Sequence, residues 1–386
     1  MRWGFLEFVC KRCGNRDPRL VGKKKDGSLY CRACVSFYGK EATKTPRVKK
    51  KASYFLPFRL SKEQTVLSRK IIENYQKGID TLVYAVCGSG KTEISYGVIA
   101  YAISHGGRVA FALPRRDVVI EIYYRLKDAF KGNKVVAVFG GHHEELEGDV
   151  IVLTTHQLFR YSSYFDLIVM DEIDAFPYKG NNVLQGFFKN ALVGHSLLMS
   201  ATPSSKVLEE YQKEGHDILE LKTRFHKKPI PVPKVLKIPL PLQILRLISL
   251  LKKYQKESKP VFVFAPTIAE AETLFSRLKV FLKKGALLHS KVKGREEKLK
   301  GIKEGQLQYL VATSVLERGV TVKNLQVLIY HADLESIYDQ ATLIQIAGRA
   351  GRKKDAPEGD VYFFASRSTK SIEGAIHEIE ECNRSL

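Results

Sequence analysis

A short glycine-rich segment of the sequence has the residue types and spacing of a loop that binds phosphate groups. Its glycines allow backbone N–H groups to face the phosphates, and the helix predicted to follow adds favourable partial charge at its N-terminus. We expect the Lys91 amine to bind the β- and γ-phosphates of ATP and the Thr92 hydroxyl to bind Mg²⁺. A chance glycine-rich turn is the alternative, and Ala85 stands where the usual pattern begins with glycine. The predicted ATP-binding residues of this loop are Gly88, Ser89, Gly90, Lys91 and Thr92.

Two adjacent acids, Asp171 and Glu172, follow the apolar run Leu167–Met170. An acid at the carboxyl end of a parallel strand lies beside the phosphate loop in sheets of this kind. We expect Asp171 to bind Mg²⁺ through water and Glu172 to polarise the water molecule that attacks the γ-phosphate. An acidic helix cap is the alternative, but it explains a single acid better than an adjacent pair.

Two arginines in a glycine-interrupted segment, Arg349 and Arg352, have the chemistry needed to stabilise a transferred phosphoryl group. A planar guanidinium pairs with phosphate oxygens through two N–H donors and stays charged throughout. We expect both side chains to reach the γ-phosphate as arginine fingers. A basic helix interrupted by glycines would give a similar string.

Four cysteines, Cys10, Cys13, Cys31 and Cys34, form two CxxC pairs with 17 residues between them. This spacing is typical of a site in which four thiolates bind one Zn²⁺ in a tetrahedron. Two disulfides are the alternative, which a cytoplasmic location disfavours. The sequence therefore predicts a small N-terminal zinc module.

Short apolar runs, separated by stretches of helical pattern, must position the other candidate residues. Near-continuous apolar strands between helices indicate parallel sheets that are covered on both faces. The sequence therefore predicts an α/β protein with two domains of similar size in addition to the zinc module. The predicted strands are Thr81–Val86, Arg108–Leu113, Val135–Phe139, Asp149–Leu153, Leu167–Met170, one beginning near Leu197, Pro260–Ala265, Leu287–Leu288, Tyr309–Ala312, Val327–Tyr330 and Val361–Phe364.

The domain limits follow from length and composition. A chain of 386 residues is longer than one hydrophobic core usually serves. Residues 226–242 hold five of the fourteen prolines, which indicates a stiff, extended linker. We predict a zinc module with a basic connector at 1–53, an ATP-binding domain at 54–228 and a second domain at 229–386.

The charge of the chain indicates a polyanionic partner. The net charge is +22, and residues 1–53 alone hold 15 Lys and Arg against 4 Asp and Glu. Such a basic surface favours nucleic acid or an anionic membrane face, with a merely solubilising tail as the alternative. We find neither an apolar run long enough to span a membrane nor a signal peptide, so we expect a cytoplasmic protein.

The order of these segments resembles that of superfamily 2 helicases. Asp171–Asp174 resembles motif II, Ser200–Thr202 resembles motif III and Gln345–Arg352 resembles motif VI. The resemblance implies two RecA-like domains that bind ATP between them and step along one nucleic-acid strand. It implies coupling roles for Asp174, Ser200, Thr202 and Gln345, and ATP-binding roles for Gln64 and Gly319. It implies contacts with the phosphate backbone at Pro114, Arg115, Arg116, Thr154, Thr155, His156, Thr267 and Thr313.

A zinc module that precedes a compact two-domain motor, and the Ala-Phe-Pro-Tyr extension at residues 175–178, resemble the ComFA family of competence helicases in Gram-positive bacteria. That resemblance implies an ATPase stimulated by single-stranded DNA, which acts in DNA uptake at the inner face of the cell membrane. It implies partners resembling ComFC, DprA and the ComEC channel. The alternatives are a replication-restart helicase resembling PriA, an RNA helicase, and a zinc-stapled DNA-binding scaffold that uses ATP only as a switch.

Overall fold

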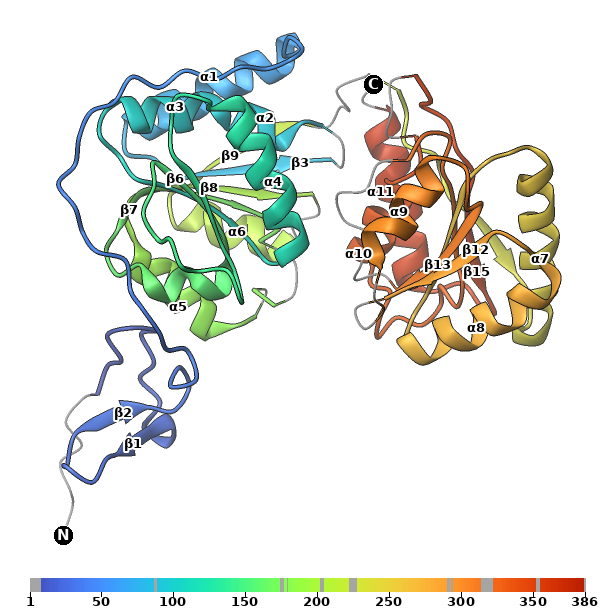
Figure 1. Cartoon of the computed structure of the whole chain (residues 1–386), viewed down its shortest axis with the longest axis horizontal. Helices are drawn as coiled ribbons and strands as arrows, with labels where there is room; N and C mark the ends of the chain where they lie inside the picture. Colours follow the sequence, from blue (N-terminus) through green and yellow to red (C-terminus); the bar gives the residue numbers. More distant parts are fainter. Residues whose placement is uncertain are drawn as a thin grey trace. The chain divides into compact units, whose positions relative to one another are not determined.

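A computed structural model describes residues 8–86, 89–173, 177–178, 180–201, 205–221, 228–289, 292, 294–313, 322–351 and 355–384 (Figure 1). These residues form two compact units, one within Met1–Ala85 and Gly90–Leu221 and the other within Val86–Ser89 and Lys222–Leu386. Each unit has its own parallel sheet, so the predicted α/β fold is confirmed. Within the described ranges, no helix is both long and apolar enough to cross a membrane.

The first unit is built on a seven-stranded parallel sheet with the strand order β5-β6-β4-β7-β8-β3-β9. Its strands are β3 (Thr81–Ala85), β4 (Val109–Leu113), β5 (Val135–Val138), β6 (Val150–Thr154), β7 (Phe165–Asp171), β8 (Leu192–Ser200) and β9 (Asp217–Leu221). Its helices are α1 (Lys62–Gln76), α2 (Lys91–Ile94), α3 (Tyr96–Ser104), α4 (Arg116–Ala129), the 3-10 helix η2 (Thr155–Arg160), α5 (Asn182–Ala191) and α6 (Ser205–Lys213).

Side chains of the first sheet alternate between two apolar cores. Val169 of β7 packs in the core that α1, α3 and α4 cover. Its neighbours Ile168 and Met170 pack in the other core, under η2 and α5. This alternation is what a pleated strand imposes, and burial on both faces explains why these strands are continuous apolar runs.

The second unit has a six-stranded parallel sheet with the order β10-β15-β14-β11-β13-β12. Helices α7 and α8 pack on one face, and α10 and α11 pack on the other. The strands are β10 (Lys234–Lys237), β11 (Val261–Ala265), β12 (Gly285–Leu288), β13 (Tyr309–Thr313), β14 (Gln326–Ile329) and β15 (Val361–Ala365). The helices are α7 (Leu240–Lys256), α8 (Ile268–Phe281), α9 (Arg295–Lys303), α10 (Gln340–Ala347) and α11 (Lys370–Arg384).

Part of the proline-rich segment is not a linker. Lys234–Lys237 forms strand β10, which pairs in parallel with β15 at the edge of the second sheet, and α7 begins at Leu240. The prediction of an extended linker over the whole of 226–242 is therefore wrong. The physical reason is that prolines lie only on either side of β10, and an edge strand tolerates prolines at its ends.

Two strands of the first sheet also differ from the prediction. Strand β8 begins at Leu192 rather than near Leu197, because its first residues are only partly covered and give no apolar run. Strand β9 was missed, since Asp217 and Glu220 interrupt its apolar pattern at the edge of the sheet.

The four-cysteine segment is a small module with an antiparallel hairpin. Strand β1 (Val21–Lys23) pairs with β2 (Leu29–Cys31), and a short 3-10 helix, η1 (Pro18–Leu20), precedes them. The module packs on the first unit in the same apolar core as α5. At Gly186 of α5, an added Cβ would lie 1.9 Å from the carbonyl oxygen of Cys13. The helix and the cysteine loop therefore meet backbone to backbone.

A basic segment, residues 40–56, runs along the first unit from the module to α1, and we call it the strap (Figure 1). The Arg160 guanidinium donates to the Lys40 carbonyl over 2.5 Å. Farther along, Arg47 pairs with Asp166 and Lys50 pairs with Asp149, both at 2.7 Å. The predicted basic connector is thus bound along its length to the unit that it precedes.

Candidate active site and zinc site

The phosphate loop lies between the end of β3 and the start of α2. Gly90 is the residue before α2 and has a φ of 83°, a conformation that glycine adopts without strain. Lys91 donates to the Ala85 carbonyl oxygen over 3.4 Å, and its amine lies 3.9 Å from Asp171 Oδ1. Both side chains are about nine-tenths shielded from solvent, at 14% and 13% exposure. The structure therefore brings together the predicted phosphate-binding lysine and the predicted magnesium-binding acid.

Glu172, the second acid, lies in the turn directly after strand β7. Strand β7 ends at Asp171, and Glu172 has a positive φ of 60°. The Glu172 N–H donates to Asp171 Oδ1 over 2.8 Å, so the turn also orients the first carboxylate. Positive φ is unfavourable for a residue with a side chain, and such strain is concentrated at functional sites.

Gln64, the predicted adenine-reading residue, is buried at the start of α1. Its Oε1 accepts from the Ser61 N–H over 2.8 Å, and its own N–H donates to Ser61 Oγ over 3.1 Å. This pair is a capping box. Gln64 Nε2 lies 2.5 Å from where a Cβ of Gly90 would stand. The side chain therefore lies against the phosphate loop, and its adenine contact stays a prediction.

Other predicted residues of the first unit follow the carboxyl ends of neighbouring strands. Strand register pairs Leu113 with Thr154, and Asp171 with Met199, which precedes Ser200. Because parallel strands end at one edge of a sheet, these residues lie along the same edge as the phosphate loop. Pro114 is buried after β4, and Arg115 is the residue before α4. Arg116 is exposed, with its guanidinium 4.8 Å from the centroid of the Phe139 ring.

The segment after β6 packs against the four-cysteine module. Thr155 is fully buried, and the His156 ring stacks on Phe37 with centroids 6.1 Å apart. Burial lowers the pKa of His156. Phe37 also contacts Phe187 of α5, with centroids 5.0 Å apart. Of the predicted nucleic-acid contacts after β6, His156 is therefore the one that packs directly on the module.

In the second unit, the predicted residues also lie at strand and helix ends. The Thr267 hydroxyl accepts from the Glu270 N–H over 3.2 Å and caps α8. Thr313 ends β13 beside Ala265 of β11 and is buried. Gln345 lies in α10, and Arg349 follows that helix, buried, with its guanidinium 6.0 Å from the Phe264 ring. Predicted residues Gly88, Asp174, Thr202, Gly319 and Arg352 lie outside the described residues.

The four cysteines are arranged as ligands of one metal ion. The sulfurs of Cys10 and Cys34 are 3.6 Å apart, those of Cys13 and Cys31 are 3.7 Å apart, and all four lie within 4.8 Å of one another. Zn²⁺ bound to four thiolates at about 2.3 Å has sulfur–sulfur distances of about 3.8 Å. A disulfide needs about 2.0 Å, and the four cysteines are free. The geometry fits zinc and excludes two disulfides.

The thiols are not equivalent as acids. Burial raises the pKa of Cys13 to about 11. Burial also disfavours the Cys10 thiolate, but hydrogen bonds from the backbone of Cys13 and Arg12 outweigh it, and the pKa of Cys10 is lowered. Because zinc binds thiolates, its binding must release protons, and at Cys13 the proton is held tightly at neutral pH.

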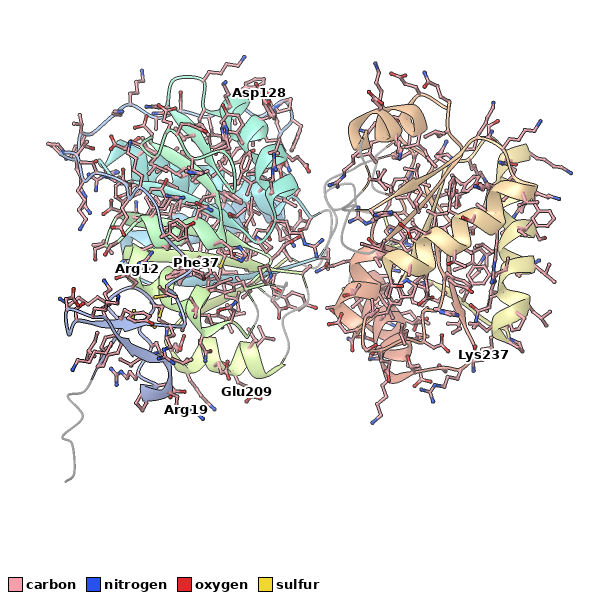
Figure 2. All side chains as sticks on the ribbon, turned by 60° about the horizontal axis from the view of Figure 1, so that its bottom comes forward. Arg12, Arg19, Phe37, Asp128, Glu209 and Lys237 are labelled. Atoms are coloured by element: carbon pink, nitrogen blue, oxygen red, sulfur yellow. The ribbon has the colours of Figure 1, made fainter. Side chains whose placement is uncertain are left out.

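Sequence reasoning missed Phe37 and Arg160, which join the module to the first unit. Arg160 is buried, donates to Gln157 over 2.6 Å, and contacts a carbonyl 120 positions earlier in the chain. Figure 2 shows Phe37 and Arg12 where the module meets the first unit. No local pattern marks these residues, since their partners are distant in sequence.

Comparisons with known proteins agree with this geometry. Residues 65–211 match the DEAD/DEAH box helicase family, and residues 243–354 match the helicase conserved C-terminal domain. Competence protein ComFA of Bacillus subtilis is 35% identical, over 97% of this chain and 86% of its own. Competence protein ComFA of Streptococcus pneumoniae is 32% identical, over 94% of this chain and 92% of its own. Among solved structures, S. cerevisiae Dbp5 bound to RNA and ADP BeF3 has a TM-score of 0.62 over 85% of this chain and 92% of that chain. Because the two sequences are only 17% identical, this similarity concerns the fold alone.

Proposed function

The chain belongs to the ComFA family of competence proteins, and we propose that it is an ATP-driven translocase on single-stranded DNA that draws in transforming DNA. It is an ATPase of the superfamily 2 helicase type, with both helicase domains matched. The observation that carries the proposal is the coverage of its competence relatives, 97% and 94% of the chain.

The chemistry proposed for the first unit is supported by the closeness of two of its side chains, Lys91 and Asp171. Lys91 binds the phosphates, while Thr92 and Asp171 hold Mg²⁺, which neutralises phosphate charge when it is bound. Glu172 orients and polarises the attacking water. The separation of 3.9 Å between Lys91 Nζ and Asp171 Oδ1 supports this assignment, because a phosphate oxygen and a metal ion need adjacent positive and negative groups.

We assign Arg349 and Arg352 the stabilisation of charge on the transferred phosphoryl group. Gln64 and Gly319 are proposed as further ATP contacts, and Asp174, Ser200, Thr202 and Gln345 as residues that couple hydrolysis to the grip on DNA. The proposed backbone contacts are Pro114, Arg115, Arg116, Thr154, Thr155, His156, Thr267 and Thr313. Contacts of this kind give little sequence preference and a strong dependence on salt.

An ATPase titration over three nucleic acids tests the proposal. We expect single-stranded DNA to stimulate turnover much more than duplex DNA or RNA of equal length. Stimulation by RNA as strong as that by single-stranded DNA would contradict the DNA assignment. Equal stimulation by duplex DNA would contradict translocation on a single strand.

The zinc site and the partners complete the proposal. We propose one Zn²⁺ per chain at Cys10, Cys13, Cys31 and Cys34, supported by the tetrahedral spacing of their sulfurs. We further propose that the protein works in the cytoplasm at the inner face of the membrane, with ComFC-like and DprA-like proteins and the ComEC channel. Co-purification of the tagged chain with each partner from competent cells tests this. The absence of all three from the purified material would contradict it.

A further inference from the structure

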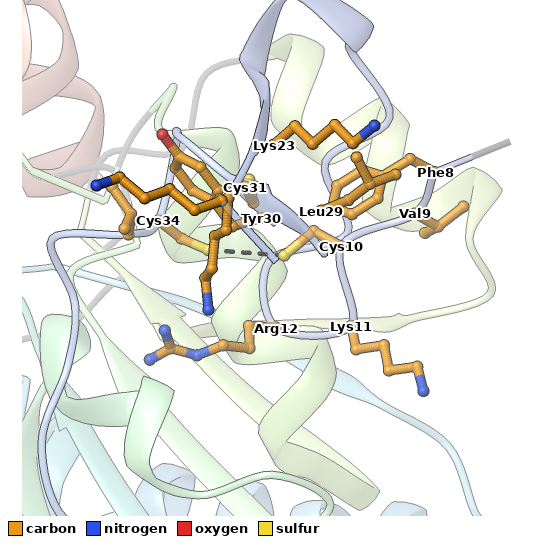
Figure 3. A pocket seen from close by; sticks show the side chains of 13 residues that line it. Phe8, Val9, Cys10, Lys11, Arg12, Lys23, Leu29, Tyr30, Cys31 and Cys34 are labelled. Carbon is orange, nitrogen blue, oxygen red and sulfur yellow. Dashed lines mark hydrogen bonds between the residues drawn. The ribbon is translucent and has the colours of Figure 1, made fainter. Parts of the chain in front are cut away.

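The four-cysteine module has a cavity that the proposed motor function does not use. A groove of about 1160 Å³ opens over the hairpin and the first cysteine loop, and the proposed zinc ligands Cys10, Cys31 and Cys34 form part of its wall (Figure 3). Pockets that hold small molecules usually measure about 300–1000 Å³ and are mostly enclosed by apolar walls. This groove is larger and its rim is charged, which suits a segment of a polymer better than a compact ligand.

The charge in the groove has one sign. Lys11, Arg12, Lys23, Lys24 and Lys25 line it, and none of the described residues that line it is acidic. Of the nearby acids on the same module, Asp17 pairs with Arg19 at 2.7 Å. Asp26 accepts a hydrogen bond from the Ser28 hydroxyl over 2.7 Å and also interacts electrostatically with Lys24. The five lining cations still outnumber this one neighbouring carboxylate, so the groove has a net positive field that complements a polyanion.

The groove also exposes apolar surface between these cations. Val9, Leu29 and Val35 line it and are 42%, 48% and 53% exposed. Tyr30 adds an aromatic ring, which lies so close over Gly22 that a Cβ there would be 2.3 Å from the ring carbon Cζ. Proteins hold single strands with cations that contact the phosphates and aromatic rings that stack on the bases. The groove offers the cations, one such ring and apolar side chains.

The groove continues toward the predicted nucleic-acid contacts of the first unit. Arg12 lines the groove, and its guanidinium lies 5.2 Å from the ring centroid of Phe159 in η2. Helix η2 begins at Thr155 and contains His156. One arginine thus lies both in the groove and against the helix that carries two predicted backbone contacts.

We propose that this groove binds a short stretch of single-stranded DNA, as a second grip outside the two helicase domains. The inference rests on the proposed function, in which single-stranded DNA is the substrate, and adds a site for it. Lys23, Lys24 and Lys25 hold phosphates, and the Tyr30 ring and Leu29 contact bases. An acidic protein segment would satisfy the cations but would leave the apolar surface without a matching group.

Substitution of the hairpin lysines tests the groove. The triple variant Lys23→Gln, Lys24→Gln, Lys25→Gln removes three exposed charges, and the matched control Lys252→Gln, Lys256→Gln, Lys279→Gln removes three exposed charges from α7 and α8. The measurement is the anisotropy of a labelled oligothymidine at several salt concentrations, with zinc content measured alongside. We expect at least tenfold weaker binding for the hairpin variant and a salt slope smaller by about 2, since single strands contribute about 0.7 per phosphate.

A second variant separates the apolar contribution from the charges. Leu29→Ser should weaken binding several-fold while leaving the salt slope unchanged. Affinity of the hairpin variant within twofold of wild type, or a loss equal to that of the control, would overturn the inference. So would a labelled oligoglutamate that competes for the groove better than oligothymidine. Failure of the proposed function looks different, because the wild-type ATPase would then gain nothing from single-stranded DNA.

Discussion

The four-cysteine site and the ATP site of the first unit are built in opposite ways. The cysteines come from two short turns, and their sulfurs already have the spacing that a tetrahedral metal ion requires. At the ATP site, Lys91 begins helix α2 after the loop that follows β3, and Asp171 ends β7, so the two meet only because the sheet brings the carboxyl ends of these strands to one edge. The first site depends on local spacing and the second depends on the whole sheet.

This difference predicts how the two sites fail. A change at the cysteine site should remove the metal and loosen what packs on the module, while the sheet stays folded. A change at the ATP site should stop chemistry with little loss of stability, because the strand ends are fixed by cores on both faces.

The largest effect is expected at Glu172. Glu172→Gln removes the group that polarises the attacking water, so ATP turnover should fall by about 100-fold or more, while ATP binding and zinc content stay unchanged. Steady-state ATPase assays, nucleotide binding and metal analysis measure the three quantities. Glu144→Gln, at an exposed glutamate of the same unit, is the control. Turnover close to wild type would remove Glu172 from the catalytic role.

The next effect concerns the metal. Cys13→Ser should lower zinc from about one ion per chain to a small fraction, and should expose the face of α5 to protease. Cys382→Ser, in α11 of the second unit, should keep the zinc. Metal analysis and limited proteolysis check both. Full zinc occupancy in Cys13→Ser would show that the other three cysteines suffice.

The same site should respond to pH in a defined direction. Burial raises the pKa of Cys13 to about 11, so protons compete with zinc at neutral pH and below. Zinc should therefore be lost to a chelator faster as the pH falls from 8 to 6. Release rates that are constant over this range would contradict proton competition.

A smaller effect, on stability, is expected where the four-cysteine module contacts helix α5 of the first unit. In Gly186→Ala the new methyl group would meet the Cys13 carbonyl oxygen at 1.9 Å, so α5 and the cysteine loop must separate. We expect a loss of about 1–3 kcal/mol in the free energy of unfolding, measured by denaturant titration. Gly132→Ala is the control, because a Cβ there meets nothing within 4 Å. If Gly186→Ala were as stable as Gly132→Ala, the contact between α5 and the cysteine loop would contribute nothing measurable to the free energy of unfolding.

The smallest effect is expected on the strap. Arg47→Ala removes an ion pair whose arginine is half exposed, so the loss should be about 0.2–1 kcal/mol. It should shrink further at high salt, because exposed charges are screened. Lys44→Ala, exposed on the same strap, gives the baseline. A loss above that range would mean that the strap carries more of the stability than its exposed pairs suggest.

The sequence was sufficient for the fold class and for the grouping of the four cysteines, while the roles of the ATP-site residues stay predictions. Apolar runs such as Val109–Leu113 predict parallel strands because burial on both faces requires continuous apolar side chains. Two of the four edge strands, β9 and β10, were not predicted, because acids interrupt the apolar pattern of β9 and prolines flank β10. The packing of Phe37 on His156 was not predicted either, because the two residues are far apart in sequence and no local pattern marks them.

The strap has a consequence for the order in which the protein forms during synthesis. Its contacts join residues 99 and 120 positions apart, Lys50 with Asp149 and Lys40 with Arg160. A chain is made from its N-terminus, so the cysteines leave the ribosome long before the surface on which they rest. We expect ribosome-bound chains that end before β5, and so lack Asp149 and Arg160, to hold zinc and yet leave residues 40–56 open to protease. The module would then fold first, and the strap that joins it to the first unit would bind that unit later.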